Sequence, residues 1–259
     1  MTWRAITIAG SDPTGGAGIQ QDLKTFAALG VWGLSAVTAI TVQDTTGVRR
    51  WEPVGPQLVR AQLDAVMGEI GCDAAKTGML GTIETVDAVA RAVGDHAIAP
   101  LVVDPILSAG GGDSLSRGDL AGAIRELLFP RAALITPNTV EASALSGLDV
   151  TTRDEQKEVA VALAADGPEA VLVTGGHLEG ERVTDVLVAG GELVELAGPR
   201  VDGGDIHGTG CALSAAITAF IARGEGIETA VRRARALVVD AIARAATLGK
   251  GARVLEVRA

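Results

Sequence analysis

The sequence is poor in aromatic residues: it has no tyrosine and only three tryptophans and three phenylalanines among 259 residues. Proteins that read single-stranded nucleic acids stack the bases on aromatic side chains, so this composition argues against that function. Cysteine is also scarce, since Cys72 and Cys211 are the only two, and the three histidines are scattered along the chain. Neither a disulfide framework nor a structural zinc site is therefore predicted.

Positively charged residues are also fewer than negatively charged ones. Lysine and arginine total 22 against 32 aspartates and glutamates, which gives a net charge of −10, and there is no dense basic run. We therefore expect no nucleic-acid partner. The sequence also has no uncharged apolar run of about 18 residues, and its first residues lack the basic start and apolar core of a signal peptide. We expect no membrane partner and a cytoplasmic location.

Apolar residues, by contrast, make up 47% of the chain and charged residues only 21%, which is enough material for a core. Short apolar, β-branched runs such as Ala36–Val42 and Leu101–Asp104 alternate with helical patterns such as Thr82–Val93. This alternation predicts an α/β fold with a mostly parallel central sheet covered by helices on both faces. We expect a single domain over residues 1–259.

One glycine-rich stretch, Gly203–Ala216, runs directly into an alanine-rich helical pattern. Gly208 and Gly210 lack a Cβ, so the backbone can approach a ligand closely, and the unpaired N–H groups of a helix start suit a phosphate. Cys211 would lie in the first turn, where the helix start lowers the pKa of a thiol. Alternatively, the glycines only turn the chain and Cys211 is a small buried hydrophobic residue.

This stretch is similar to the active-site loop of the ribokinase-like family, in the branch whose G-T-G-C motif carries cysteine where sugar kinases have an aspartate base. That branch contains hydroxymethylpyrimidine and phosphomethylpyrimidine kinases. Further segments resemble it in the family's order along most of the chain. They are Ala9–Gln20, Thr38–Thr45, Lys76–Leu80, Val103–Pro105 and Thr136–Glu141.

The resemblance implies a ribokinase-like three-layer sandwich and an ATP-dependent kinase. Its acceptors would be 4-amino-5-hydroxymethyl-2-methylpyrimidine and then the monophosphate of that pyrimidine, in thiamine diphosphate biosynthesis. The partners implied are the small-molecule pyrimidine, a nucleotide and a second copy of the chain, as a homodimer. The amides of Gly208, Thr209 and Gly210 would hold the migrating phosphoryl group, and Cys211 would face the acceptor oxygen.

The resemblance also implies a set of substrate-binding residues: Gln43, Asp22, Gly10, Ala17, Val42 and Met79. Gln43 would follow the strand Ala36–Val42, and its side chain offers an acceptor and a donor side by side. An aminopyrimidine presents the complementary pair, a ring nitrogen beside an amino group. Read without the resemblance, Gln43 is a polar turn residue, Asp22 complements a helix dipole and Met79 belongs to the core.

For the cofactors, the N-x-x-E motif formed by Asn138 and Glu141 resembles the site that organises Mg²⁺ in the family, with Asp104 as a second candidate ligand. Locally, Asn138 and Glu141 could equally form a helix capping box. Thr174 stands where the family typically has a lysine that contacts nucleotide phosphates. Arg235 matches a lysine position in relatives, but we do not expect it to replace that charge, because its place in the chain differs.

Two alternatives stay open from the sequence. The first is a pyridoxine or pyridoxal kinase of the same superfamily, which phosphorylates a related hydroxymethyl ring. The second is a non-catalytic, pyrimidine-binding regulatory relative, suggested by Thr174 and by Asp44, which stands where the family usually has asparagine. The presence of Cys211 and Glu141 argues against the second alternative.

Overall fold

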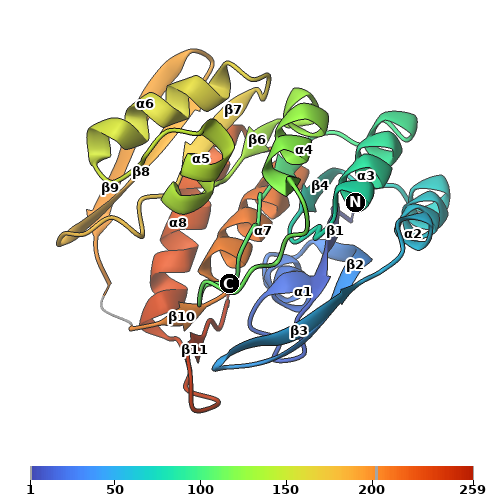
Figure 1. Cartoon of the computed structure of the whole chain (residues 1–259), viewed down its shortest axis with the longest axis horizontal. Helices are drawn as coiled ribbons and strands as arrows, with labels where there is room; N and C mark the ends of the chain where they lie inside the picture. The colour runs from blue at the N-terminus through green and yellow to red at the C-terminus, as the bar shows by residue number, and fades with distance from the viewer. Residues whose placement is uncertain (1, 202–203, 259) are drawn as a thin grey trace.

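The computed structural model describes residues 2–201 and 204–258 (Figure 1). Gly203, with which the glycine-rich stretch begins, lies outside the described residues. Within them, nine strands form one sheet in the order β3-β2-β1-β4-β5-β6-β7-β8-β9, and β10 pairs with β11 in a small second sheet. The strands are β1 (Arg4–Ser11), β2 (Trp32–Asp44), β3 (Gly47–Pro53), β4 (Ala74–Thr77), β5 (Leu101–Val103), β6 (Leu134–Ile135), β7 (Ala170–Val173), β8 (Arg182–Ala189), β9 (Glu192–Pro199), β10 (Ile206–His207) and β11 (Arg253–Val254).

The centre of the large sheet is parallel. Strands β2, β1, β4, β5, β6 and β7 pair in parallel, whereas β3 at one edge and β8 and β9 at the other are antiparallel to their neighbours. Parallel strands are buried on both faces, which explains why β4 and β7 are buried throughout. The prediction of a mostly parallel sheet is confirmed.

Helices cover both faces of this sheet, which confirms the three layers (Figure 1). Helices α1, α7 and α8 pack on one face, and α2 to α6 pack on the other. None of the helices in the described part of the chain is long and apolar enough to span a membrane. The helices are α1 (Gly18–Ala28), α2 (Pro56–Glu69), α3 (Ile83–Asp95), α4 (Leu120–Leu127), α5 (Thr139–Ser146), α6 (Arg153–Ala164), α7 (Thr209–Ala222) and α8 (Ile227–Ala243), with a short 3₁₀ turn at Phe129–Arg131.

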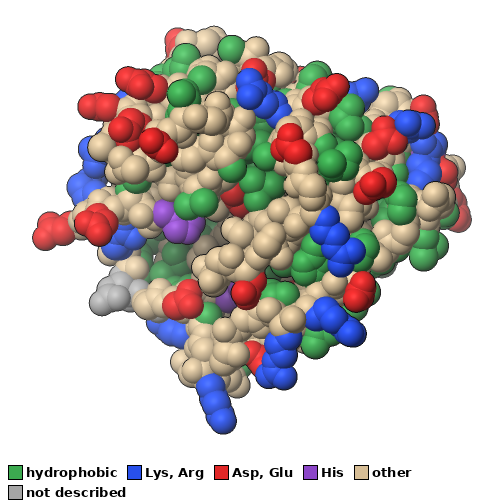
Figure 2. Space-filling view, viewed as in Figure 1, with side chains coloured by type: hydrophobic (Ala, Val, Ile, Leu, Met, Phe, Trp, Pro, Cys, Tyr) green, Lys and Arg blue, Asp and Glu red, His purple; other side chains and the backbone are tan. Residues whose placement is uncertain are grey.

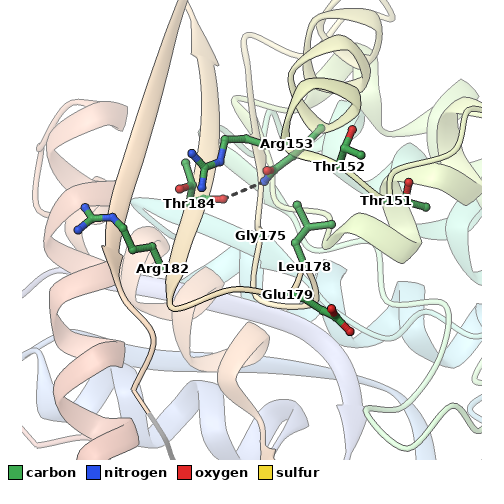
Figure 3. Close-up of a pocket in the computed structure, with 9 residues that line it drawn as sticks. Thr151, Thr152, Arg153, Gly175, Leu178, Glu179, Arg182 and Thr184 are labelled. Atoms are coloured by element: carbon green, nitrogen blue, oxygen red, sulfur yellow. Dashed lines mark hydrogen bonds between the residues drawn. The ribbon is translucent and has the colours of Figure 1, made fainter.

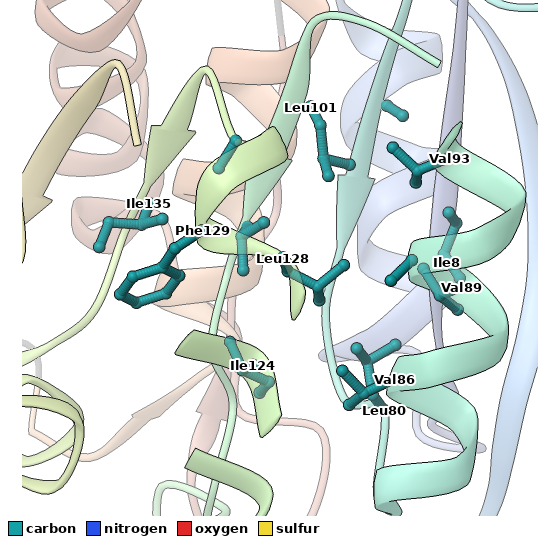
Figure 4. Packing of buried hydrophobic residues seen from close by; sticks show 14 of the residues in the cluster. Ile8, Leu80, Val86, Val89, Val93, Leu101, Ile124, Leu128, Phe129 and Ile135 are labelled. Atoms are coloured by element: carbon teal, nitrogen blue, oxygen red, sulfur yellow. The ribbon is translucent and has the colours of Figure 1, made fainter. Parts of the chain in front are cut away.

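Each helix layer has its own apolar core, and both cores are mainly aliphatic. Ile8, Leu101 and Phe129 belong to the core under α2 to α6 (Figure 4). Ala5 and Phe26 belong to the core on the other face. Because successive side chains of a strand point to opposite faces, β1 contributes to both cores. The sheet therefore needs few aromatic side chains, in agreement with the composition.

Helix α7 differs from the others because every residue from Cys211 to Ala222 is buried. A helix that is apolar on all sides is expected inside a protein rather than on its surface. It packs against the sheet with α1 and α8 beside it. The hydroxyl of Ser214 donates to Asp104 Oδ2 at 2.8 Å, which fixes the start of α7 beside the end of β5.

Candidate active site

Several of the predicted site residues lie at the carboxyl ends of the parallel strands. Asp104 directly follows β5, Asn138 lies shortly after β6, and Thr174 directly follows β7. The backbones of Asn138 and Thr174 pair in a short parallel bridge. In open α/β sheets, ligands bind beyond the carboxyl ends of the strands. Figure 2 shows that this face of the molecule is hollowed near its middle, with apolar side chains inside the hollow.

The start of α7, residues 208–211, is called the phosphoryl cradle below. Its first intrahelical hydrogen bond runs from the Ala212 N–H to the Gly208 carbonyl, which leaves the amides of Thr209, Gly210 and Cys211 without helix partners. Gly208 has a φ of +90°, and a Cβ there would lie 1.8 Å from the Gly16 carbonyl oxygen. Glycine is required at this position, and the free amides can receive an anion.

A buried lysine that was not predicted as a site residue, Lys76, lies next to the cradle. Lys76 Nζ is 3.0 Å from both carboxylate oxygens of Asp22 and 3.9 Å from Asp104 Oδ2, and its side chain is 0% exposed. Burial by itself lowers the pKa of Lys76, but the acidic neighbours, Asp22 foremost, raise it above its usual value. Lys76 is therefore a positive charge held inside the protein. The signal in the sequence was a lysine within the short predicted strand and loop after Ala74.

Asp22 has a different place from the one predicted. Its side chain is 0% exposed, and Oδ2 accepts from the Thr7 hydroxyl at 2.6 Å in addition to its contact with Lys76. A fully enclosed carboxylate cannot line an open pocket, so direct contact with the substrate is not supported. The dipole alternative is wrong too, because the first turn of α1 has no acidic residue. Asp22 instead positions Lys76.

Cys211 lies in the first turn of α7, as predicted, but the prediction of a lowered pKa is wrong for this structure. Burial raises the pKa of the thiol to about 12, and the Lys76 ammonium, which lowers it, does not offset this effect. The side chain is only 8% exposed, so desolvation outweighs the favourable field of the helix start. Burial thus favours the neutral thiol form of Cys211.

Asp104 and Glu141 form a pair of buried carboxyl groups. Burial first, and the charge of Asp104 second, raise the pKa of Glu141 to about 8. The capping box is present: Asn138 Oδ1 accepts from the Glu141 N–H, and Glu141 Oε2 accepts from the Asn138 N–H, both at 2.9 Å. The alternative prediction of a helix capping box is thus confirmed. It leaves the predicted role of Glu141 in binding Mg²⁺ open.

The residues predicted for the pyrimidine pocket lie in two regions, one with Gly10, Ala17 and Met79 and the other at the end of β2. Gly10 and Met79 are in contact, since a Cβ at Gly10 would lie 3.0 Å from Met79 Sδ. Ala17 forms the N-cap of α1. Strand β2 does not end at Val42 as predicted but continues to Asp44, and the pairing with β3 shifts between Val42 and Gln43. Such a bulge re-aims side chains, and Gln43 is half-buried while Val42 is 46% exposed.

Arg235 lies beside the β7–β8 turn, where its charge is paired with Asp185. Its Nε donates to Asp185 Oδ2 at 2.6 Å, and Asp185 Oδ1 accepts from the Gly175 N–H at 2.8 Å. Gly175 follows Thr174, which stands where the family typically has a lysine. The Asp185 carboxylate therefore connects Arg235 to the residue next to that position. Its charge is paired with Asp185, and it holds the β7–β8 turn.

A polar cavity of about 270 Å³ lies behind the same turn, on the α6 side (Figure 3). Arg153, Gln156 and Thr184 are among its lining residues. Thr184 and Asp185 point to opposite faces of β8, so this cavity and Arg235 lie on opposite sides of the sheet. Among the described residues, none that was predicted for the site lines the cavity, and we assign it no role.

Comparisons with known proteins identify the family of this chain. A family model described as phosphomethylpyrimidine kinase matches residues 12–256. The hydroxymethylpyrimidine/phosphomethylpyrimidine kinase of Rhizobium meliloti (strain 1021) is 45% identical over 255 residues, which cover 97% of this chain and 94% of that protein.

Solved structures with the same fold include two vitamin kinases. The ADP complex of Bacillus subtilis pyridoxal kinase matches with a TM-score of 0.92 and 36% identity over 99% of this chain and 97% of that chain. The phosphomethylpyrimidine kinase of Clostridium difficile 630 matches with a TM-score of 0.83 and 36% identity over 93% of this chain and 100% of that one. The chain belongs to the phosphomethylpyrimidine kinase family, with the ribokinase-like fold.

Proposed function

We propose that this chain transfers the γ-phosphoryl group of ATP to the hydroxymethyl group of 4-amino-5-hydroxymethyl-2-methylpyrimidine, and then phosphorylates the resulting monophosphate. The product would serve thiamine diphosphate biosynthesis. The observation that carries this proposal is the phosphoryl cradle, whose three free amides lie next to the enclosed charge of Lys76. Family membership supplies the acceptor and the donor.

In the proposed reaction the acceptor oxygen bonds to the γ-phosphorus, the bond from that phosphorus to the leaving ADP oxygen breaks, and the hydroxyl proton passes to Cys211 in its ionised form. Phosphoryl transfer has a loose transition state, so positioning and neutralisation of charge contribute most of the catalysis. The amides of Thr209 and Gly210 would donate to the migrating group, with Gly208 allowing the close turn. Lys76 would add a fixed positive charge in a region of low dielectric.

Cys211 would face the acceptor oxygen. A neutral thiol cannot accept a proton, so in the state described here Cys211 can only orient the hydroxyl. It becomes a base once its own proton has passed to solvent, and the neighbouring Lys76 ammonium favours that ionised form. Because the loose transition state needs little deprotonation of the acceptor at the start, this late role is sufficient.

Asp104 and Glu141 would hold Mg²⁺. Carboxylate oxygens are suitable ligands, and Mg²⁺ keeps several waters, so two protein ligands are enough. When bound, the ion would neutralise negative charge on the nucleotide phosphates. Asn138, Thr174 and, through Asp185, Arg235 would support the nucleotide.

A pyridoxal kinase is the second candidate, because Bacillus subtilis pyridoxal kinase matches almost the whole chain with a TM-score of 0.92. Competition between the pyrimidine and pyridoxal in an ADP-release assay separates the two functions.

We also propose a homodimer, since Ile40 and Val42 on the β2–β3 hairpin are 51% and 46% exposed and a partner would cover them. The cytoplasmic location stays a prediction.

Cys211→Ala should bind the pyrimidine as the wild type does but lower kcat by about 10²- to 10⁴-fold, the usual contribution of a group that accepts a proton. Calorimetry gives the binding constant, and a coupled ADP-release assay gives kcat. Cys72→Ala is the matched control and should leave both unchanged. A normal kcat in Cys211→Ala would remove Cys211 from the mechanism.

Glu141→Gln should change how the requirement for Mg²⁺ depends on pH. With a pKa of about 8, wild-type Glu141 is protonated at neutral pH, so a cation must displace its proton. The apparent affinity for Mg²⁺ should therefore increase as pH rises toward about 8 and then level off, whereas Glu141→Gln should lack this increase. Mg²⁺ titrations of ADP release between pH 6.5 and 9 measure it.

The matched control for this experiment is Glu155→Gln, because Glu155 occupies the same capping-box position at the start of α6. This variant should keep the wild-type pH dependence. Parallel curves for the wild type and Glu141→Gln would contradict a direct role of Glu141 in holding the ion.

Gln43→Leu should lower kcat/KM for the aminopyrimidine by roughly one to two decades, because a buried polar group without its partner costs about 1 to 3 kcal/mol. An analogue without the amino group has already lost part of that energy, so the substitution should harm it less, and the two penalties should be non-additive. The measurement is kcat/KM for both substrates with both proteins. An equal loss for both would mean that Gln43 does not recognise the pyrimidine edge.

A further inference from the structure

The carboxylate of Asp12 organises the loop that follows β1, residues 12–17, called the substrate loop below. It accepts from the Thr14 N–H at 2.8 Å, the Thr14 hydroxyl at 2.9 Å and the Ala17 N–H at 2.8 Å. Asp12 is only 2% exposed. Burial alone would raise its pKa, but the hydrogen bonds, that of His207 foremost, lower it to about 2. The loop is thus wound around an ionised, buried carboxylate.

The same carboxylate joins the substrate loop to the phosphoryl cradle. Its Oδ2 lies 2.9 Å from Nε2 of His207, although the two residues are 195 positions apart. His207 ends β10 and directly precedes Gly208, which begins the cradle. One polar pair therefore links the segment expected to hold the acceptor with the segment expected to hold the phosphoryl group.

Backbone packing at this junction is tight. A Cβ at Gly16 would lie 2.7 Å from His207 Cδ2 and 2.4 Å from Val254 Cγ1, and a Cβ at Gly208 would lie 1.8 Å from the Gly16 carbonyl oxygen. On its other side, β10 is held by its pairing with β11. The substrate loop and the cradle are therefore in direct contact at this junction.

We propose that Asp12 and His207 are positioning residues that couple the two half-sites, so that a nucleotide in the phosphoryl cradle increases the affinity of the substrate loop for the pyrimidine, and the reverse. This inference rests on the function proposed above. In this proposal the pair acts by holding the two segments together and not through the reacting atoms. Gly15 and Gly18, with φ of +75° and +56°, border the part of the loop that would move when the pair is broken. Coupling of this kind must be reciprocal.

The test measures coupling rather than activity. The dissociation constant of 4-amino-5-hydroxymethyl-2-methylpyrimidine is determined by calorimetry with and without the non-hydrolysable nucleotide AMP-PCP. In the wild type, AMP-PCP should tighten pyrimidine binding by a factor of about 5 to 150. In His207→Ala this factor should fall to about 1. In His207→Gln it should recover in part, because the glutamine amide can donate to Asp12.

His96→Ala is the matched control. His96 Nε2 pairs with Asp64 Oδ1 at 2.7 Å, and the His96 side chain is 22% exposed, as is that of His207. This variant removes a histidine–aspartate pair between α2 and the end of α3, and it should leave the coupling factor unchanged. A merely structural role of His207 would lower Tm and leave the coupling factor at its wild-type value, which would overturn the proposal.

Hydrogen exchange gives a readout that does not require the pyrimidine. AMP-PCP should slow exchange of the Gly15, Gly16 and Ala17 amides in the wild type and in His96→Ala, but not in His207→Ala. Equal protection in all three proteins would also overturn the coupling. A wild type that binds AMP-PCP and protects the substrate loop, yet does not phosphorylate the pyrimidine, would instead refute the proposed acceptor and leave the coupling standing.

Discussion

The site depends on one ionic interaction, the fully enclosed contact of Lys76 with Asp22. Removing two charges from water is costly, and such a pair persists only where geometry and further hydrogen bonds offset the loss. Here Thr7 donates to Asp22, and Asp104 Oδ2, which accepts from Ser214, lies 3.9 Å from the ammonium. Loss of one partner would leave an unpaired buried charge, at a cost of roughly 3 to 5 kcal/mol.

The same interaction explains why each neighbouring element is where it is. Asp22 comes from α1, Lys76 from β4 and Asp104 from the end of β5, so two central strands and one helix are tied together where they contact α7. The positive charge sits where the proposed reaction concentrates negative charge. Structural and chemical requirements therefore fall on the same residues, and Asp22 can matter for the reaction without touching a ligand.

Much of the fold could be predicted because its signals are local. Apolar runs directly before Asp104 and Thr174 identify strands, and parallel strands bring their carboxyl ends to one edge, so the position of these residues followed from pattern alone. The capping box of Asn138 and Glu141 is likewise a motif of four consecutive residues. Helices α4 and α6 lie in stretches for which we made no prediction, although Thr152 and Glu155 provide a capping-box signal for α6.

What could not be predicted depends on contacts between distant segments. The raised pKa of Cys211 results from burial, which no single stretch of sequence determines, and the helix start alone gives the opposite sign. Arg235 meets Asp185 across 50 positions, and Lys76 meets Asp22 across 54. His207 also contacts Asp12, and Ser214 contacts Asp104, across long stretches of the chain. Such contacts raise the contact order of the site above that of the helices around it. Because non-local contacts form only after the entropy of closing long loops has been overcome, the site should assemble late in folding, when most of the sheet is already in place.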